Sequence, residues 1–377
     1  MQRASKRRDL ITSVLIWAII IIFGIGIFFL PAEDFSRSEG RYLASFPTLS
    51  PENLLDGSFF EGLSDFYLDR LPLREQFAKI YALCERSLGK REVNGTILCR
   101  NGVLVLRPGA KNENTLQANL NAVNSLCKSN SNTLFFAVPA PYSVFSEDMP
   151  YESSPKPTIS NDCYAQFLSV SSTDPTKYYY KTDHHWTTHG AYVAYTIICQ
   201  KLGIKAYEES FFEKQIVSQC FYGSAARRSS LPHSLIAADT IMLYRYDGDD
   251  KLILTDGATS PSIEGLYDLE ELNGADGYRV FLGGNSAHVS IRSGDGAKRP
   301  KLLLLKDSYA NSLLPFLALH YDVDVIDPRY AEPSQIKALC SSTDFDAILV
   351  LLGESTLSED SSVCRAAEVI CEYSKRP

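Results

Sequence analysis

KLLLLKDSYANS, residues Lys301–Ser312, combines a short apolar run with a polar turn. The four leucines predict a buried strand, and residues 308–319 have the spacing of a helix. A serine that follows such a strand and opens a helix lies at the carboxyl edge of a parallel sheet, where open α/β folds place their sites. Ser308 is therefore a candidate nucleophile, and its structural alternative is an ordinary helix N-cap.

Predicted strands and helices alternate through the rest of the C-terminal region and again upstream. The strands are Val323–Ile326, Ala347–Leu352 and Thr133–Val138, and the helices are Leu116–Leu126, His189–Leu202, Pro333–Leu339 and Ser361–Tyr373. This alternation predicts an α/β domain around a parallel sheet. Between residues 206 and 300, short runs at Ile241–Tyr246, Leu252–Thr255 and Tyr278–Leu282 alternate with turn residues, which indicates a strand-rich insertion.

The N-terminal region contains a long uncharged apolar run, Leu10–Leu30. Its length predicts a transmembrane helix, with a cleaved signal peptide as the alternative. Four basic residues precede the run and two acidic residues follow it, which places the N-terminus in the cytoplasm and the rest outside. The expected organisation is a cytoplasmic tail (1–9), an anchor (10–30), a juxtamembrane segment (31–57) and an α/β domain (58–377).

Composition excludes some classes of protein. Net charge is −8, and no basic stripe occurs beyond the first ten residues, so nucleic acid is not an expected partner. The nine cysteines are scattered without a CxxC pair, which argues against a zinc ribbon and favours buried thiols.

A second polar stretch, KTDHHWTTHGAY at Lys181–Tyr192, supplies the partners that a serine nucleophile needs. Asp183 lies two residues before His185, so its carboxylate can hold the imidazole in one tautomer. Asp183, His185 and Ser308 thus form a candidate set for acyl transfer. Trp186 follows the histidine and is either a sugar-stacking wall or part of the core.

A metal site is the rival interpretation of this stretch. His185 and His189 are four residues apart, and Asp183 or His184 could complete a site. The Asp-His-His string also resembles metal-dependent phosphoesterases, but their additional Asp-rich motifs are missing from the strand ends. We therefore expect no metal.

Together these segments resemble the DHHW protein family, named for the string Asp183–Trp186. That family is similar to the alginate O-acetylation proteins of the AlgJ and AlgX type, which carry an SGNH-hydrolase-like domain. The matching segments are Ser38–Pro47, Asp69–Arg74, Asp183–Tyr192, Lys306–Pro315 and Asp327–Tyr330. In the alginate proteins a D-x-H-W string precedes the serine, which is also the order found here.

The resemblance implies a three-layer SGNH-like fold and a catalytic set of Ser308, His185 and Asp183. It also implies substrate or oxyanion contacts, for which the candidates are Tyr309 through its backbone N–H, Trp186, Asn311 and Arg329. One departure is that an SGNH serine usually follows Gly-Asp, whereas Lys306-Asp307 precedes Ser308 here. We interpret Gly283-Gly284-Asn285, which is similar to an SGNH oxyanion block, as a plain turn.

The implied function is O-acyl transfer, in particular O-acetylation, to an extracytoplasmic polysaccharide. A multi-pass membrane acyltransferase would supply the acyl group as a partner, and serine acyl chemistry needs no cofactor. Two alternatives remain open from the sequence. One is a carbohydrate acetyl esterase that uses the same three residues, and the other is a non-catalytic glycan-binding scaffold.

Overall fold

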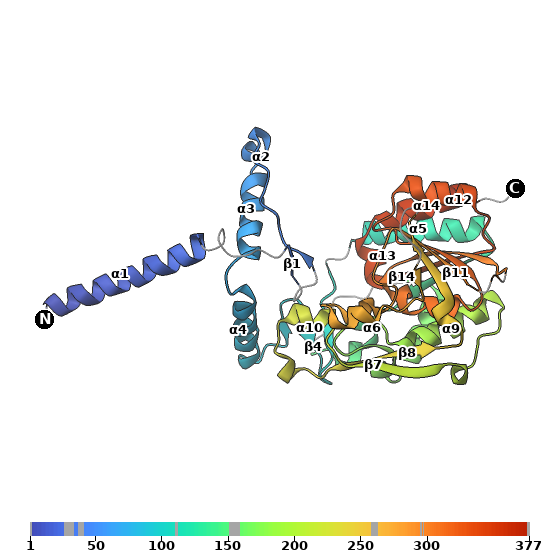
Figure 1. The fold of residues 1–377 in the computed structure, drawn as a ribbon, viewed down its shortest axis with the longest axis horizontal. Helices are drawn as coiled ribbons and strands as arrows, with labels where there is room; N and C mark the ends of the chain where they lie inside the picture. Colours follow the sequence, from blue (N-terminus) through green and yellow to red (C-terminus); the bar gives the residue numbers. More distant parts are fainter. Residues whose placement is uncertain are drawn as a thin grey trace. The chain divides into compact units, whose positions relative to one another are not determined.

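The computed structural model describes residues 2–25, 34–36, 41–109, 112–150, 159–257, 263–294, 296 and 298–374. The chain forms two units (Figure 1). One comprises Met1–Lys90 with Ser230–Pro232, and the other comprises Arg91–Ser229 with His233–Pro377. The α/β domain predicted from residue 58 thus corresponds to a unit that begins at Arg91.

The first unit consists of helices and one short hairpin. Its elements are α1 (Gln2–Ile25), β1 (Phe35–Ser36), β2 (Arg41–Tyr42), α2 (Pro51–Leu55), α3 (Ser58–Asp69) and α4 (Arg74–Ser87). Pro72 lies between α3 and α4, because proline cannot donate the backbone hydrogen bond that a continuous helix requires. Residues 43–50 of the predicted juxtamembrane segment have no regular structure.

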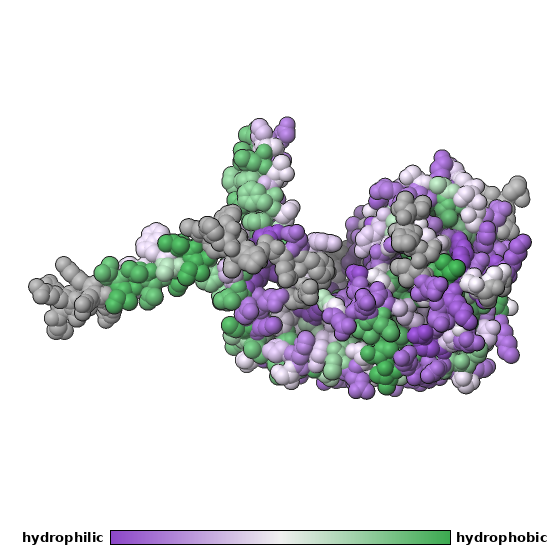
Figure 2. Space-filling view, viewed as in Figure 1, coloured by the Kyte–Doolittle hydropathy of each residue, from purple (hydrophilic) through white to green (hydrophobic). Residues whose placement is uncertain are grey.

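The predicted membrane anchor Leu10–Leu30 coincides with α1 only as far as Ile25, and residues 26–30 lie outside the described part of the chain. Apolar side chains of α1 are exposed (Figure 2). Among the described residues, no helix combines the length and the apolar character needed to cross a membrane.

A seven-stranded mixed sheet forms the centre of the second unit, in the order β10-β9-β11-β13-β12-β14-β6. Its strands are β6 (Thr133–Val138), β9 (Leu252–Asp256), β10 (Ile263–Glu264), β11 (His288–Ser293), β12 (Lys301–Lys306), β13 (Asp322–Ile326) and β14 (Ala347–Gly353). The strands β13, β12, β14 and β6 run parallel, which confirms the parallel sheet predicted from the alternation.

Helices cover both faces of this sheet (Figure 1). One face packs on α5 (Glu113–Ser129), α12 (Pro333–Ser342) and α14 (Ser362–Tyr373), and the other on α7 (Asp162–Ser171) and α9 (Thr188–Leu202). Leu302 and Leu304 lie in the core toward α9, whereas Leu303 and Leu305 lie in the core toward α5. The run of four leucines is therefore explained by a central strand that is buried on both faces.

The predicted insertion 206–300 is strand-rich, but it is not a separate module. Only β7 (Glu213–Phe221) and β8 (Asp239–Arg245) form a pair of their own. The strands β9, β10 and β11 instead extend the central sheet by antiparallel pairing. The strand predicted at Tyr278–Leu282 is wrong, because Gly277–Val280 forms a 3₁₀ turn, η7, capped by the side chain of Asp276.

The remaining elements are short. They are β3 (Glu92–Val93), β4 (Thr96–Leu98), β5 (Leu104–Leu106), α6 (Pro141–Val144), α8 (Pro175–Tyr178), α10 (Ser224–Ser229), α11 (Leu314–Leu317) and α13 (Glu354–Glu359), with 3₁₀ turns at Ser146–Asp148, Glu209–Phe211, His233–Leu235, Asp249–Lys251, Leu269–Asn273 and Ser308–Ser312. The strands β4 and β5 form an antiparallel hairpin. All nine cysteines are unpaired thiols.

Candidate active site

Ser308 lies two residues beyond the carboxyl end of β12, at the edge of the parallel sheet, and is partly exposed. It opens a 3₁₀ turn, η8 (Ser308–Ser312), and the short helix α11 follows. The single helix predicted over residues 308–319 is therefore wrong. Pro315 has no N–H to continue an α-helix through this region.

The cap of this turn is Asp307, not Ser308. One carboxylate oxygen of Asp307 accepts a hydrogen bond from the backbone N–H of Tyr309 at 3.1 Å. The other accepts from the N–H of Gly353 at 2.7 Å and from Thr356 Oγ1 at 2.7 Å. Asp307 thereby joins the ends of β12 and β14 and leaves the Ser308 hydroxyl available for other contacts.

Asp183 and His185 lie in a tight loop between two bridged residues, Tyr179 and Trp186. Asp239, at the start of β8, anchors this loop by accepting hydrogen bonds from the backbone N–H groups of Lys181 at 2.9 Å and Thr182 at 2.8 Å. The helix α9 begins directly after the loop. The loop that carries the imidazole is therefore held at one end by Asp239 and at the other by the start of α9.

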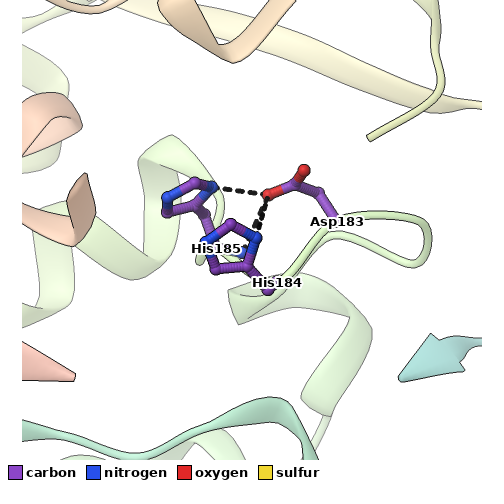
Figure 3. Close-up of side chains that lie close together, drawn as sticks. All are labelled: Asp183, His184 and His185. Carbon is purple, nitrogen blue, oxygen red and sulfur yellow. Dashed lines mark hydrogen bonds and ion pairs between the residues drawn. The ribbon is translucent and has the colours of Figure 1, made fainter. Parts of the chain in front are cut away.

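The structure brings the three predicted catalytic residues together. His185 Nε2 lies 2.7 Å from Ser308 Oγ, and His185 Nδ1 lies 2.5 Å from Asp183 Oδ1 (Figure 3 shows the aspartate and the two histidines). The same Asp183 oxygen accepts the backbone N–H of His185 at 2.9 Å. Asp183 and His185 are 1% and 4% exposed, so the relay is shielded from water except near Ser308.

Ser224 and Gly223, which were not identified from the sequence, position the Asp183 carboxylate, one by a hydrogen bond and the other by leaving space. The backbone N–H of Ser224 donates to Asp183 Oδ2 at 2.6 Å. Gly223 permits this approach, since a Cβ there would lie 2.2 Å from Asp183 Cβ. Burial favours the neutral carboxyl, but the charges of His185 and His184 and the hydrogen bond from His185 hold the pKa of Asp183 well below its ordinary value.

A second serine–histidine pair adjoins the first. His184 Nδ1 lies 2.6 Å from Ser224 Oγ, but 3.7 Å from Asp183 Oδ1, which is too far for a hydrogen bond. Burial and the charge of His185 lower the pKa of His184, so its ring is a weak base. Of the two pairs, only His185 and Ser308 have an orienting carboxylate.

A fully buried lysine lies beneath the nucleophile. Lys306 Nζ donates to Asn285 Oδ1 at 2.8 Å and to Asn311 Oδ1 at 2.9 Å, and it lies 3.4 Å from Asp327 Oδ2. Arg329 binds the same Asp327 carboxylate through two hydrogen bonds of 2.8 and 2.6 Å. The lysine that departs from the SGNH pattern is therefore buried, and its ammonium group is hydrogen-bonded within the protein.

The other predicted contacts lie elsewhere than expected. The Tyr309 N–H is bonded to Asp307, so it is not the oxyanion donor that was predicted. Trp186 is 0% exposed and donates to Ser312 Oγ at 2.9 Å, so it is a core residue and not a surface wall. Asn311 is buried and bonded at both ends of its amide, and the guanidinium of Arg329 is paired with Asp327.

Within the described part of the chain, Asp183, His184 and His185 form a set that could hold a metal ion, because one ligand atom of each lies within 4.8 Å of the others. The Nδ1 atoms of both histidines already make hydrogen bonds, to Asp183 and to Ser224. An ion bound through these Nδ1 atoms would displace both bonds and break the relay to Ser308. The predicted partner of this set, His189, instead contacts Glu209 at 2.9 Å.

Known proteins are similar to this chain at the level of a family model and of fold. Residues 151–326 match the model described as DHHW protein. The fold is similar to a DHHW family protein from Eubacterium siraeum DSM 15702, with 19% identity, a TM-score of 0.53, and coverage of 73% of this chain and 95% of that chain. No curated protein matches.

Two further solved structures are similar. One is Bacillus cereus PatB1 with a sulfonyl adduct, at 16% identity and a TM-score of 0.55, covering 70% of this chain and 98% of that one. The other is the O-acetyltransferase domain of Pseudomonas putida AlgJ, at 17% identity and a TM-score of 0.40, covering 72% of this chain and 98% of that one. The likeness to the DHHW protein family is thus shown by the family model over residues 151–326.

Proposed function

We propose that this protein is a serine-dependent O-acyltransferase that acetylates an extracytoplasmic polysaccharide. The observation that carries the proposal is the continuous relay from Asp183 through His185 to Ser308, with contacts of 2.5 and 2.7 Å. A partly exposed serine hydroxyl bonded to an oriented imidazole is the arrangement that activates a weak nucleophile.

The relay assigns one role to each residue. Ser308 Oγ attacks the acyl carbonyl carbon while His185 Nε2 takes the hydroxyl proton, and the donor's leaving group then takes that proton as it departs. The acyl group is now an ester of Ser308. In the second half, a sugar hydroxyl gives its proton to His185 Nε2 and attacks this ester. The bond between the acyl carbon and Ser308 Oγ then breaks, and Ser308 Oγ takes the proton back from His185. Asp183 keeps the proton on Nδ1, so Nε2 is the acceptor.

The oxyanion needs donors other than the Tyr309 N–H. We propose the backbone N–H of Ser308 and the side-chain amide of Asn285 for this role, which revises the interpretation of Gly283-Gly284-Asn285 as a plain turn. The Asn285 carbonyl oxygen accepts from Lys306 at 2.8 Å and from Asn311 at 3.2 Å, which orients its NH₂ group away from both. Gly283 and Gly284 have positive φ angles of 67° and 122°, which permit this turn beside the end of β12.

The fold similarity supports the same chemistry. The similar structure of Bacillus cereus PatB1 contains a sulfonyl adduct, and sulfonyl groups react with activated nucleophiles. The location outside the cytoplasm and the multi-pass acyltransferase as acyl donor are also proposals. They rest on the charge asymmetry around Leu10–Leu30 and on the family resemblance.

The test uses the full chain, p-nitrophenyl acetate as the acyl donor and phenylmethanesulfonyl fluoride as a label. We expect turnover of the ester and one covalent sulfonyl group on Ser308, both lost in Ser308→Ala. Ser224→Ala is the matched control, because it removes the hydroxyl of the neighbouring serine–histidine pair. It should keep the label and most of the turnover.

Acetylated oligosaccharide as a product, detected by mass spectrometry after addition of a soluble glycan, would establish transfer. Release of acetate alone in the presence of acceptors would make the protein an esterase. Equal turnover by Ser308→Ala and the parent protein would overturn the serine mechanism, and a parent protein without turnover or labelling would favour the scaffold.

A further inference from the structure

Tyr278 contacts both the imidazole and the nucleophile. Its ring stacks on the His185 ring with centroids 3.7 Å apart and an interplanar angle of 3°. Its hydroxyl lies 3.2 Å from the backbone carbonyl oxygen of Ser308. Among the described residues, no other side chain both packs on the His185 ring and hydrogen-bonds the Ser308 backbone.

The opposite face of the His185 ring is also covered. The His184 ring centroid lies 3.8 Å away, and because Tyr278 occupies one face in parallel contact, His184 lies over the other. The imidazole therefore has aromatic rings on two sides, Asp183 at Nδ1 and Ser308 at Nε2. Rotation of the ring out of line with Ser308 requires at least one of these contacts to break.

Tyr278 is itself held in place. Its hydroxyl bonds Ser312 Oγ at 3.1 Å, and Ser312 Oγ accepts the Trp186 indole N–H at 2.9 Å. The residue is 3% exposed and lies in η7, which Asp276 caps. Asp276 also pairs with Arg227 at 3.4 Å, and Arg227 belongs to α10, the helix whose first residue, Ser224, binds Asp183. The tyrosine and the orienting carboxylate are thus fixed through one connected set of contacts.

We propose that Tyr278 is a positioning residue, which keeps His185 in line with Ser308 by ring stacking and fixes the Ser308 backbone through its hydroxyl. The proposal rests on the function proposed above. Its physical basis is that a proton can pass only within hydrogen-bond reach, and a small misalignment of a positioned base lowers the rate strongly.

The two contacts can be separated by substitution. Tyr278→Phe keeps the ring and removes the hydroxyl, whereas Tyr278→Leu removes the ring as well. We expect kcat for p-nitrophenyl acetate to fall about threefold in Tyr278→Phe and about tenfold or more in Tyr278→Leu, with KM changed less than kcat. Tyr180→Phe is the matched control. That ring is also buried, 6.5 Å from Tyr278, and its hydroxyl makes no hydrogen bond to His185 or Ser308.

A second measurement separates positioning from general stability. The proton on His185 Nδ1, bonded to Asp183, should give a far-downfield proton NMR signal in the parent protein and in Tyr278→Phe. In Tyr278→Leu that signal should broaden or vanish while the thermal midpoint stays close to that of Tyr278→Phe. The acid limb of the pH–kcat/KM profile should also move only in Tyr278→Leu.

If Tyr278→Leu folds and keeps the parent kcat, pH profile and NMR signal, the positioning role is overturned. In that case loss of activity in Ser308→Ala would still uphold the serine mechanism. If Tyr278→Leu does not fold, the test is the kcat of Tyr278→Phe compared with that of Tyr180→Phe. A lower kcat in Tyr278→Phe supports the role of the hydroxyl, and equal values reject it.

Discussion

His185 Nε2 lies 2.7 Å from Ser308 Oγ although the two residues are 123 positions apart in the sequence. The contact forms because the loop before α9 and the turn after β12 meet at the carboxyl edge of the sheet. Neither segment alone distinguishes a working site from a cap or a core histidine. Their meeting, with Asp183 behind the imidazole, is what makes serine chemistry the best-supported function.

Replacing Asp183 by Asn tests the orienting role. An amide in the same place can donate a hydrogen bond to His185 Nδ1, which favours the tautomer with the proton on Nε2 and leaves no base there. We expect kcat/KM for p-nitrophenyl acetate to fall by about 10²–10⁴-fold with the fold intact by circular dichroism. His184→Ala should lower it less, because His184 lacks a hydrogen bond to Asp183. An equal loss in both variants would contradict this division of roles.

The central sheet and the catalytic set could be predicted because short sequence segments indicate them. Four leucines buried on both faces mark β12. The Asp-x-His and Asp-Ser strings each have an ordinary structural alternative, and their order along the chain matches the family that the sequence resembles. The roles of Gly223, Ser224 and Tyr278 could not be predicted in the same way. They act through contacts made only in the folded chain, and no periodicity or motif in their own segments indicates them.

Two errors have equally physical causes. Trp186 was a candidate for a sugar-stacking wall, but its indole N–H finds a buried partner in Ser312, so the ring can be fully enclosed. The helix expected after Ser308 is interrupted because Asp307 caps a tighter turn and Pro315 cannot donate. Side-chain hydrogen bonds of this kind override the pattern of apolar residues.

Gly223→Ala should displace the Asp183 carboxylate that orients His185. The new methyl carbon would lie 2.2 Å from Asp183 Cβ and 2.3 Å from its Oδ2, so the loop or the carboxylate must move. We expect a loss of stability of about 2 kcal/mol in urea unfolding and a fall in kcat/KM of about tenfold or more. Ser224→Ala, which keeps the backbone N–H to Asp183, should retain most of both. Parent-like values in Gly223→Ala would show that the carboxylate is free to shift.

Chelation separates serine chemistry from a metal site at Asp183, His184 and His185. Because proton transfer through the relay requires no ion, prolonged treatment with EDTA should leave ester turnover unchanged. Inductively coupled plasma mass spectrometry should find no stoichiometric metal in protein prepared without chelator. Turnover that disappears with EDTA and returns with one equivalent of zinc would support the metal interpretation instead, and His184→Ala would then abolish metal binding.

The buried Lys306 gives the last prediction, which concerns stability and pH. Burial lowers the pKa of this amine from 10.5 to about 8, despite the nearby Asp327 carboxylate. Between these two values the unfolded chain binds a proton that the folded protein does not. Unfolding therefore takes up a proton, and stability must rise with pH in this window. Below about pH 8 both states are protonated and Lys306 contributes no slope.

The contribution of Lys306 to the pH dependence of stability is isolated by comparing the parent protein with Lys306→Met. All other titrating groups are present in both proteins, so their contributions cancel. The difference in unfolding free energy between the parent protein and Lys306→Met should increase in favour of the parent between about pH 8 and 10.5. The increase should be at most about 3 kcal/mol. The variant should fold, since Arg329 still pairs with Asp327. Lys301→Met removes an exposed lysine from the other end of β12 and should show no such gain. A flat difference for Lys306→Met would mean that the ammonium keeps its proton to high pH, held by Asn285, Asn311 and Asp327 more strongly than burial opposes it.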